Sequence, residues 1–165
     1  MARKPCPECG AEISSKARQC PQCGHPVYRG FEWKSRASVL GYPLVHVAFG
    51  RSKETGRLLV AKGVVAIGQF GIGAITFAQF GIGFVFGFGQ CVLGTIAVGQ
   101  LALGISFGLG QLATGLTAIG QVALGRHVLA QIGIGQYVWS PKVRDPEAVE
   151  HFRAIWDFLK SLAGR

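Results

Sequence analysis

Charged residues are almost absent from the middle of this sequence. Of its 17 Lys and Arg residues and eight Asp and Glu residues, only Arg126 falls within residues 63–139. Residues 1–62 hold eleven basic and four acidic residues, so they supply +7 of the formal net charge of +9. A basic segment beside an uncharged one suits two kinds of partner, nucleic acid or an anionic membrane surface. Charge alone does not choose between them.

Catalytic motifs are also missing. Gly71 and Gly73 form a G-x-G pair, but the helix and acidic residue of a dinucleotide site do not follow, and no G-K-[ST] supplies a phosphate loop. Cys91 has no His or Arg beside it in sequence that would activate its thiol. His46 alternates with apolar residues and has no second metal-binding residue nearby. These absences predict a protein that is not an enzyme.

No apolar run precedes the first cysteine. We therefore expect no secretory signal peptide and a cytoplasmic location. Thiols stay reduced in that compartment, so paired cysteines indicate a metal site before they indicate a disulfide.

The cysteines that are present form two matching pairs. Cys6, Cys9, Cys20 and Cys23 follow the spacing C-x2-C-x10-C-x2-C within the phrases CPECG and CPQCG. The glycine after each pair allows a tight turn that points two thiolates at one ion. Four thiolates leave no open coordination position, so the pattern predicts a structural Zn²⁺, with an iron site of rubredoxin type as the alternative. His25 is expected to be a neighbour of this site and not a ligand.

The two phrases resemble the short zinc ribbons found at the ends of many bacterial and archaeal proteins, over residues 3–27. The resemblance implies a minimal metal-binding hairpin, which we assign to residues 1–27, and we expect a protein partner to dock on it. Residues 28–43 follow as a linker that mixes basic and aromatic side chains. Such a mixture suits single-stranded nucleic acid, a membrane interface, or packing on the next domain.

A β-hairpin is predicted after the linker. Residues 44–49 and 58–61 read as strands on either side of the turn SKETG, whose glycine suits a hairpin closed by a bulge. The phrases GYPLVHVAFG and AKGVVAIG, joined to a zinc ribbon, resemble a group of bacterial proteins without an established activity. In that group such a hairpin leads into a glycine-rich hydrophobic repeat.

Regular glycines divide residues 63–139 into fifteen units, thirteen of five residues and two of six. A small residue opens each unit, Gln stands second in alternate units, and the pattern recurs about every 21 residues. Five residues turn an α-helix by roughly 500°, so these glycines would line no helical face. An odd unit also cannot continue one flat strand. The pattern predicts a bend at each unit, as in a β-solenoid of about 21 residues per coil.

The unit G-Q-[FLV]-[AG]-[LI] resembles the pentapeptide-repeat β-helix, which implies that a small and a central apolar residue point inward. We therefore expect a mainly β domain over residues 44–139, with its glutamines stacked as an amide ladder. One alternative is a shallow closed β-barrel of 10- or 11-residue hairpins. The other is transmembrane helices, because residues 63–125 are long enough for two or three spans. That run, however, has no polar segment at which the chain could leave a bilayer.

A C-terminal helix is predicted within residues 140–165. Asp145 can cap a helix whose first residue is Pro146, and Gly164 ends it. We expect this amphipathic helix to cap the last coil, with a helix on a membrane surface as the alternative. Its apolar stripe consists of Val149, Phe152, Trp156 and Leu159.

These features favour a non-enzymatic scaffold or adaptor. The zinc ribbon would dock a partner, while the apolar repeat would associate with a membrane or with other copies of the chain, since one of its faces stays uncovered. The expected location is therefore cytoplasmic and membrane-associated. One alternative is a nucleic-acid-binding protein that uses the ribbon and the basic linker. The other is an integral membrane protein with helical spans.

Overall fold

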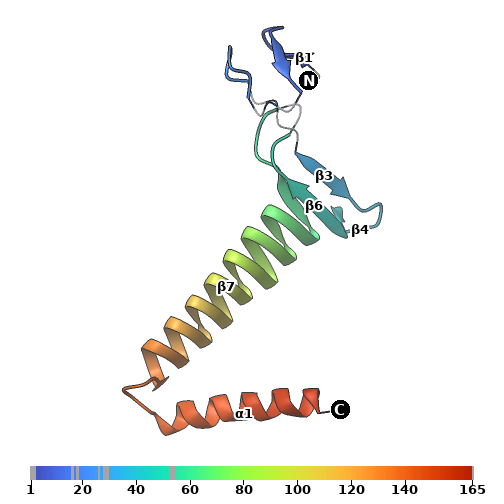
Figure 1. Cartoon of the computed structure of the whole chain (residues 1–165). Helices are drawn as coiled ribbons and strands as arrows, with labels where there is room; N and C mark the ends of the chain where they lie inside the picture. Colours follow the sequence, from blue (N-terminus) through green and yellow to red (C-terminus); the bar gives the residue numbers. More distant parts are fainter. Residues whose placement is uncertain are drawn as a thin grey trace.

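The computed structural model describes residues 3–15, 17, 19–25, 27, 30–52 and 55–164. Along the chain, Figure 1 shows a small N-terminal unit, a short sheet, a long coiled segment and one C-terminal helix. The described residues are therefore mainly β, as predicted, with a single α-helix among them.

None of the described residues forms a helix that is both long and apolar enough to cross a membrane. The alternative of transmembrane helices is therefore not supported.

The N-terminal unit is built on a short antiparallel hairpin. Strand β1 (Arg3–Pro5) pairs with β2 (Glu12–Ser14), and Lys4 lies opposite Ile13. Ile13 is buried together with Cys6 and Cys20, so three side chains make most of a very small core. A core of this size needs a second source of stability, such as a metal ion.

A three-stranded sheet follows, in the order β3 (Phe31–Lys34), β6 (Val45–Phe49) and β7 (Val60–Trp139). Strand β3 is antiparallel to β6, whereas β6 is parallel to residues 65–68 of β7. The turn between β3 and β6 carries the two-residue strands β4 (Ser38–Val39) and β5 (Tyr42–Pro43).

The predicted hairpin is confirmed only at its tip. Arg51 and Leu58 form an isolated antiparallel bridge, but the main partners of β6 are β3 and the first turn of β7. The reason lies in the burial pattern, because β6 buries His46 and Ala48 in register with Ala66 and Gly68 of β7. Strand β6 thus adds a further layer to the end of β7.

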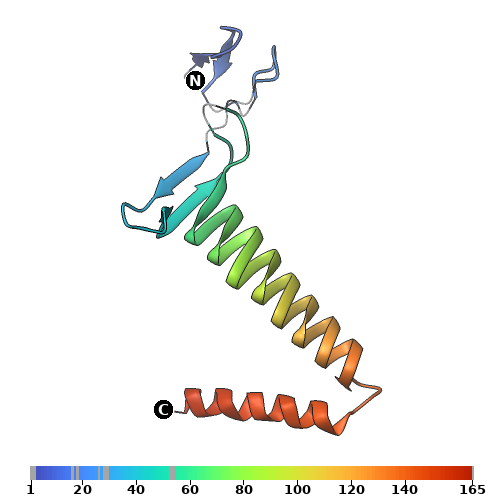
Figure 2. The ribbon, with the colours of Figure 1, turned by 180° about the vertical axis from the view of Figure 1, so that it is seen from behind.

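Strand β7 is continuous over 80 residues, and its path winds as a coil around one axis (Figures 1 and 2). Each turn of the coil lies directly against the turn before it, ten or eleven residues earlier in the sequence. The two turns are so close that a Cβ atom added to one glycine would collide with the carbonyl oxygen of the glycine one turn earlier. Such neighbours are Gly63 and Gly73, Gly89 and Gly99, Gly99 and Gly110, Gly110 and Gly120, and Gly125 and Gly135. The prediction of about 21 residues per coil is therefore wrong, because each turn of β7 holds two units instead of four.

The interior of β7 explains the shorter turn. Most units bury a small residue, so burial recurs about every five residues along much of the strand. Alanine and glycine are too small to fill the space inside a four-sided coil, and protein interiors are close-packed. A coil with only two sides is narrow enough for alanine side chains to fill its interior. The fully buried positions include Ala61, Ala66, Thr76, Ala97, Ala102, Ala113, Ala118, Ala123 and Val128.

Helix α1 (Pro146–Ala163) begins and ends where the sequence predicts. The Asp145 side chain accepts a hydrogen bond from the Glu147 N–H, and the Gly164 N–H donates to the carbonyl of Lys160. Its first turns pack on β7 through Phe152, whereas Trp156 stays 59% exposed. The helix leaves the coil at an angle (Figure 1), so it caps the last turn with only part of its predicted stripe.

Candidate metal centre

The four predicted cysteines are brought together by the N-terminal hairpin and the turn that follows it. Their sulfur atoms all lie within 4.8 Å of one another. The Sγ atoms of Cys6 and Cys23 are 3.7 Å apart, and those of Cys9 and Cys20 are 3.6 Å apart. A tetrahedron with Zn–S bonds of about 2.3 Å has edges of roughly 3.8 Å. The cluster therefore fits a tetrahedral zinc ion.

Two nearly identical turns hold these sulfurs. The Gly10 N–H donates to the Cys6 carbonyl at 3.0 Å, and the Gly24 N–H donates to the Cys20 carbonyl at 2.9 Å. Both glycines have positive φ angles, 72° and 74°. A residue with a Cβ atom adopts that conformation at a cost, which explains why each CPxC phrase ends in glycine.

Comparison with known proteins agrees with this geometry. A model of the zinc-ribbon domain matches residues 6–27. The chain begins with a zinc ribbon. No curated protein and no solved structure matches the chain, so the resemblance of the later units to pentapeptide repeats is not supported.

The backbone of the ribbon prepares two of the thiols to bind metal. The backbone N–H groups of Cys23 and Gln22 lower the pKa of the Cys20 thiol to about 7 against the opposing effect of burial, and those of Cys9 and Glu8 lower the pKa of Cys6. Both sulfurs belong to the buried pair, and the lowered pKa of each favours the thiolate that binds metal.

The other two thiols, Cys9 and Cys23, have raised pKa values and need the bound cation to become thiolates. The backbone N–H of His25 lowers the pKa of the Cys23 thiol, but burial and the neighbouring thiols Cys9, Cys20 and Cys6 outweigh it and raise the pKa to about 12. Four thiolates this close together repel one another unless a positive ion lies between them. The ribbon is thus built around its structural Zn²⁺.

His25 does not join the cluster, as predicted. Its Nδ1 atom contacts the carboxylate of Glu8, on the opposite turn of the ribbon. This contact joins the two turns outside the four sulfurs.

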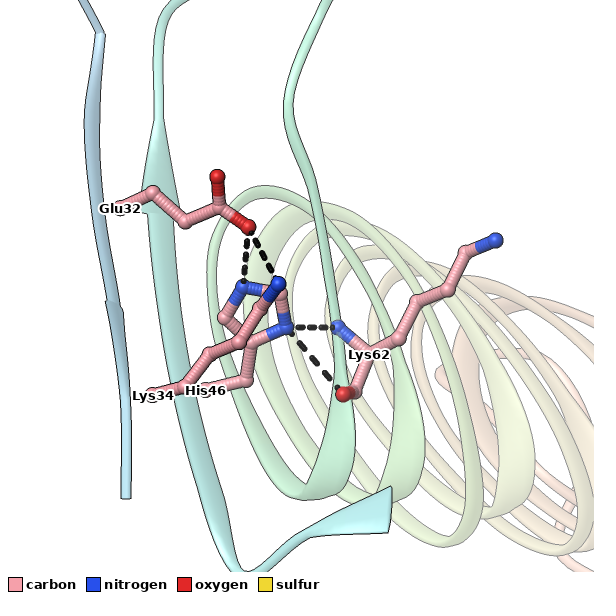
Figure 3. A network of polar contacts seen from close by, with 4 residues as sticks. All are labelled: Glu32, Lys34, His46 and Lys62. Atoms are coloured by element: carbon pink, nitrogen blue, oxygen red, sulfur yellow. Dashed lines mark hydrogen bonds and ion pairs between the residues drawn. The ribbon is translucent and has the colours of Figure 1, made fainter. Parts of the chain in front are cut away.

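The second polar site surrounds His46, where β3, β6 and β7 meet (Figure 3). The Lys62 N–H donates to His46 Nδ1 at 2.7 Å, so the ring carries its proton on Nε2, which lies 3.2 Å from Glu32 Oε1. Lys34 Nζ lies 2.8 Å from the same oxygen and lowers the pKa of Glu32. His46 is only 4% exposed and both ring nitrogens are occupied, which gives it a structural role.

A third cluster was not visible in the sequence. The rings of His127 and His151 stack with centroids 4.1 Å apart, and Tyr137 stacks on His127 at 5.1 Å. The Thr117 Oγ1 atom lies 2.9 Å from His151 Nε2. Burial and then the charge of His127 lower the pKa of His151. Only the ten-residue turn brings residues 117, 127 and 137 into line, so a 21-residue coil could not predict this site.

Cys91 lies far from the ribbon in sequence and is half-buried in β7. It lines an apolar groove together with Phe70, Phe80, Leu93 and Leu103. Its surroundings agree with the packing role expected from the sequence.

Proposed function

We propose that the protein is a non-enzymatic scaffold. In this proposal its zinc ribbon docks a protein partner, and β7 is a β-solenoid with two five-residue units per turn whose outer wall is an association surface. The observation that supports it best is the distribution of large apolar side chains around β7. The interior accepts little more than alanine, so these side chains have nowhere to go but outward.

The outer wall of β7 is apolar on both of its sides. The glutamine side is formed by the units that begin at residues 68, 78, 89, 99, 110, 120 and 130, and the opposite side by the units between them. On the glutamine side the exposed large residues are Ile72, Phe80, Ile82, Leu93, Leu112, Leu124, Ile132 and Ile134. On the opposite side they are Phe77, Phe84, Val85, Phe88, Ile96, Ile105, Leu109 and Leu116. An apolar surface this large requires a cover.

The ribbon supports a docking role because it offers no open metal position. A Cys₄ site is closed, so its zinc stabilises a fold and does not activate water. Most of the described ribbon residues are exposed, and the ribbon stands at the sheet end of β7, away from α1 (Figure 2). Its role in the proposal is to present a small rigid surface to a protein.

Sedimentation of the full chain with and without lipid vesicles tests the proposal. We expect the chain to bind vesicles or to self-associate in detergent-free buffer, and to stay bound in high salt, because apolar contacts do not depend on counterions. A monomer that stays in the supernatant under all these conditions would overturn it.

Nucleic-acid binding is the second candidate, favoured by the exposed rings of Phe31 and Trp33 near the basic residues Arg36 and Arg51. Stacking on such rings supports single-stranded binding. The same sedimentation with an oligonucleotide decides it, since binding must fall steeply as salt rises.

A further inference from the structure

We propose that residues 63–125 of β7 span a lipid bilayer, with the axis of the coil along the membrane normal. This inference rests on the proposed β-solenoid and its association surface, and it names hydrocarbon as the cover of the wall. Four independent features carry it: length, the symmetry of the wall, the placement of aromatic residues and the pairing of the backbone.

The uncharged part of the coil has the length of a bilayer. Residues 63–125 contain no Asp, Glu, Lys, Arg or His, and Lys62 and Arg126 border them. With ten or eleven residues per turn this segment makes about six turns, and at about 4.8 Å between neighbouring strands it is roughly 29 Å long. The hydrocarbon core of a typical bilayer is about 30 Å thick.

The wall is apolar on both of its sides. Within residues 63–125, six of the fourteen exposed large residues lie on the glutamine side and eight on the opposite side. A docked partner, or the surface of a membrane, would cover one side and leave the other in water. An environment that is apolar all around the axis covers both.

Aromatic residues are sorted by type along the axis. All Trp and Tyr residues of the chain lie outside residues 63–125, whereas the seven aromatic residues inside are all Phe. Trp33 and Tyr42 are exposed at the sheet end, and Tyr137 and Trp139 lie at the last turn. Trp and Tyr concentrate at the two interfaces of a membrane because one end of each ring is polar.

The backbone meets the main requirement of a bilayer, which is that no polar group faces lipid unpaired. Strand β7 is continuous, and along most of its length its neighbours are its own turns, so its backbone groups pair along the axis. The hydroxyls of Thr95 and Thr114 donate to the carbonyls of Phe84 and Gly104 one turn earlier. At the two ends of β7, β6 pairs with residues 65–68 of the first turn and α1 packs against the last turns.

Six glutamines are the polar feature that the bilayer must accommodate. They stand one per turn from residue 69 to residue 121, and the Gln69 Oε1 atom accepts a hydrogen bond from the Gly50 N–H. Amides that repeat at about 4.8 Å can bond to one another along the axis. The described residues show no hydrogen bond between two of these glutamines, so the proposal requires that their amides pair with one another in the bilayer, where water does not compete for them.

The distribution of charge sets the orientation. The N-terminal 62 residues carry a net charge of +7, and basic flanks remain on the cytoplasmic side of a membrane. The zinc thiolates then stay in the reducing compartment. Helix α1 follows the far end of the coil (Figure 1), and its Trp156, Leu159 and Leu162 side chains are exposed.

Polarised infrared spectroscopy of the full chain in vesicles of phosphatidylcholine and phosphatidylglycerol tests the orientation. In a spanning coil the carbonyl groups point along the membrane normal, so the amide I dichroism of the β-structure must show a transition moment along the normal. A coil that lies on the surface gives a moment in the membrane plane, which would overturn the inference and leave the proposed function intact. Absence of any binding to vesicles or to other copies would overturn both.

A charge at mid-depth provides a matched pair of variants. Leu93→Arg places the charge near the middle of the uncharged segment, at a cost of about 2.5–3.5 kcal/mol, so the ratio of alkali-resistant to extractable protein should fall roughly 100-fold. Leu40→Arg adds the same charge at a residue that is 94% exposed in the turn between β4 and β5, and it should change nothing. Both variants must keep the β-type circular dichroism of the parent in detergent. Folded Leu93→Arg that remains alkali-resistant would overturn the inference.

Discussion

At the scale of single residues, the size of the inward side chain sets the width of β7. Ala97, Ala102, Ala113, Ala118 and Ala123 are fully buried at nearly regular intervals, and the larger side chains beside them face outward. Small residues therefore act here as a core, while the residues that form most protein cores are exposed. The five-residue unit could be predicted from the sequence because glycine marks it directly.

Enlarging one inward residue should therefore destabilise the coil. Ala118→Leu inserts three carbon atoms between two sides that already touch, and we expect a loss of about 1–3 kcal/mol in the free energy of unfolding. Thermal or denaturant unfolding followed by circular dichroism measures it. Leu116→Ala is the control, because Leu116 is 58% exposed and its loss should cost little. Equal effects of the two variants would contradict the inward register.

The four sulfurs of the ribbon should act as one unit. Cys20→Ser removes a ligand from a closed site, so bound zinc should fall from one ion per chain to nearly none and the N-terminal hairpin should lose its protection from protease. Metal analysis of the purified chain measures the first effect. Cys91→Ser is the control and should keep its zinc, since Cys91 lies in β7. Retention of zinc by Cys20→Ser would contradict the four-thiolate site.

At the scale of elements, the two ends of β7 are closed in different ways. Strand β6 continues the layers at one end with its buried His46 and Ala48. Helix α1 closes the other end with its first turns, through Phe152 and the stacked pair of His127 and His151. The helix end is the weaker one, because most of its contacts come from a few rings.

Acidification should release α1 from β7. The pKa of His151 is lowered in the docked helix by burial and by His127, so the docked form binds a proton less well than the free helix does. Docking is therefore strongest above the ordinary histidine pKa of about 6.5 and weakens as pH falls below it.

Tryptophan fluorescence of Trp139 and Trp156, followed between pH 7.5 and pH 5, measures this release. His127→Phe keeps a ring in the stack with Tyr137 but removes a charge that lowers the pKa of His151, so acidification should weaken docking less than in the parent. A transition that is unchanged in His127→Phe would contradict the role of the pair.

Comparison of prediction and structure separates local from non-local information. The cysteine turns, the cap at Asp145 and the end of α1 depend on neighbouring residues, and all were predicted. The number of units in a turn depends on how closely the two sides of the coil approach each other. The length of the sequence repeat does not predict that distance. Insertions recur every 21 residues because one turn of ten and one of eleven follow each other, so the sequence period spans two turns. The parallel pairing of β6 also joins residues 20 positions apart, beyond the reach of a turn motif.

At the scale of the whole molecule, three chemically distinct parts follow one another. A basic, zinc-stabilised head stands at the sheet end, an uncharged coil with an apolar wall follows, and an amphipathic helix leaves the far end (Figure 1). The proposed scaffold and its proposed membrane span both require that β7 winds with two units per turn. A different winding would change the length of the coil and the sides to which its large residues point.

The distance between two residues on the glutamine side tests most directly whether β7 winds with two units per turn. Nitroxide-bearing unnatural residues at positions 79 and 131, which leave every cysteine in place, are separated by five turns. Electron–electron resonance should give a backbone separation of roughly 24 Å, from about 4.8 Å per turn. A coil of about 21 residues would bring the two positions to roughly 12 Å, and a continuous helix would part them by roughly 78 Å. Either of those distances would contradict the account.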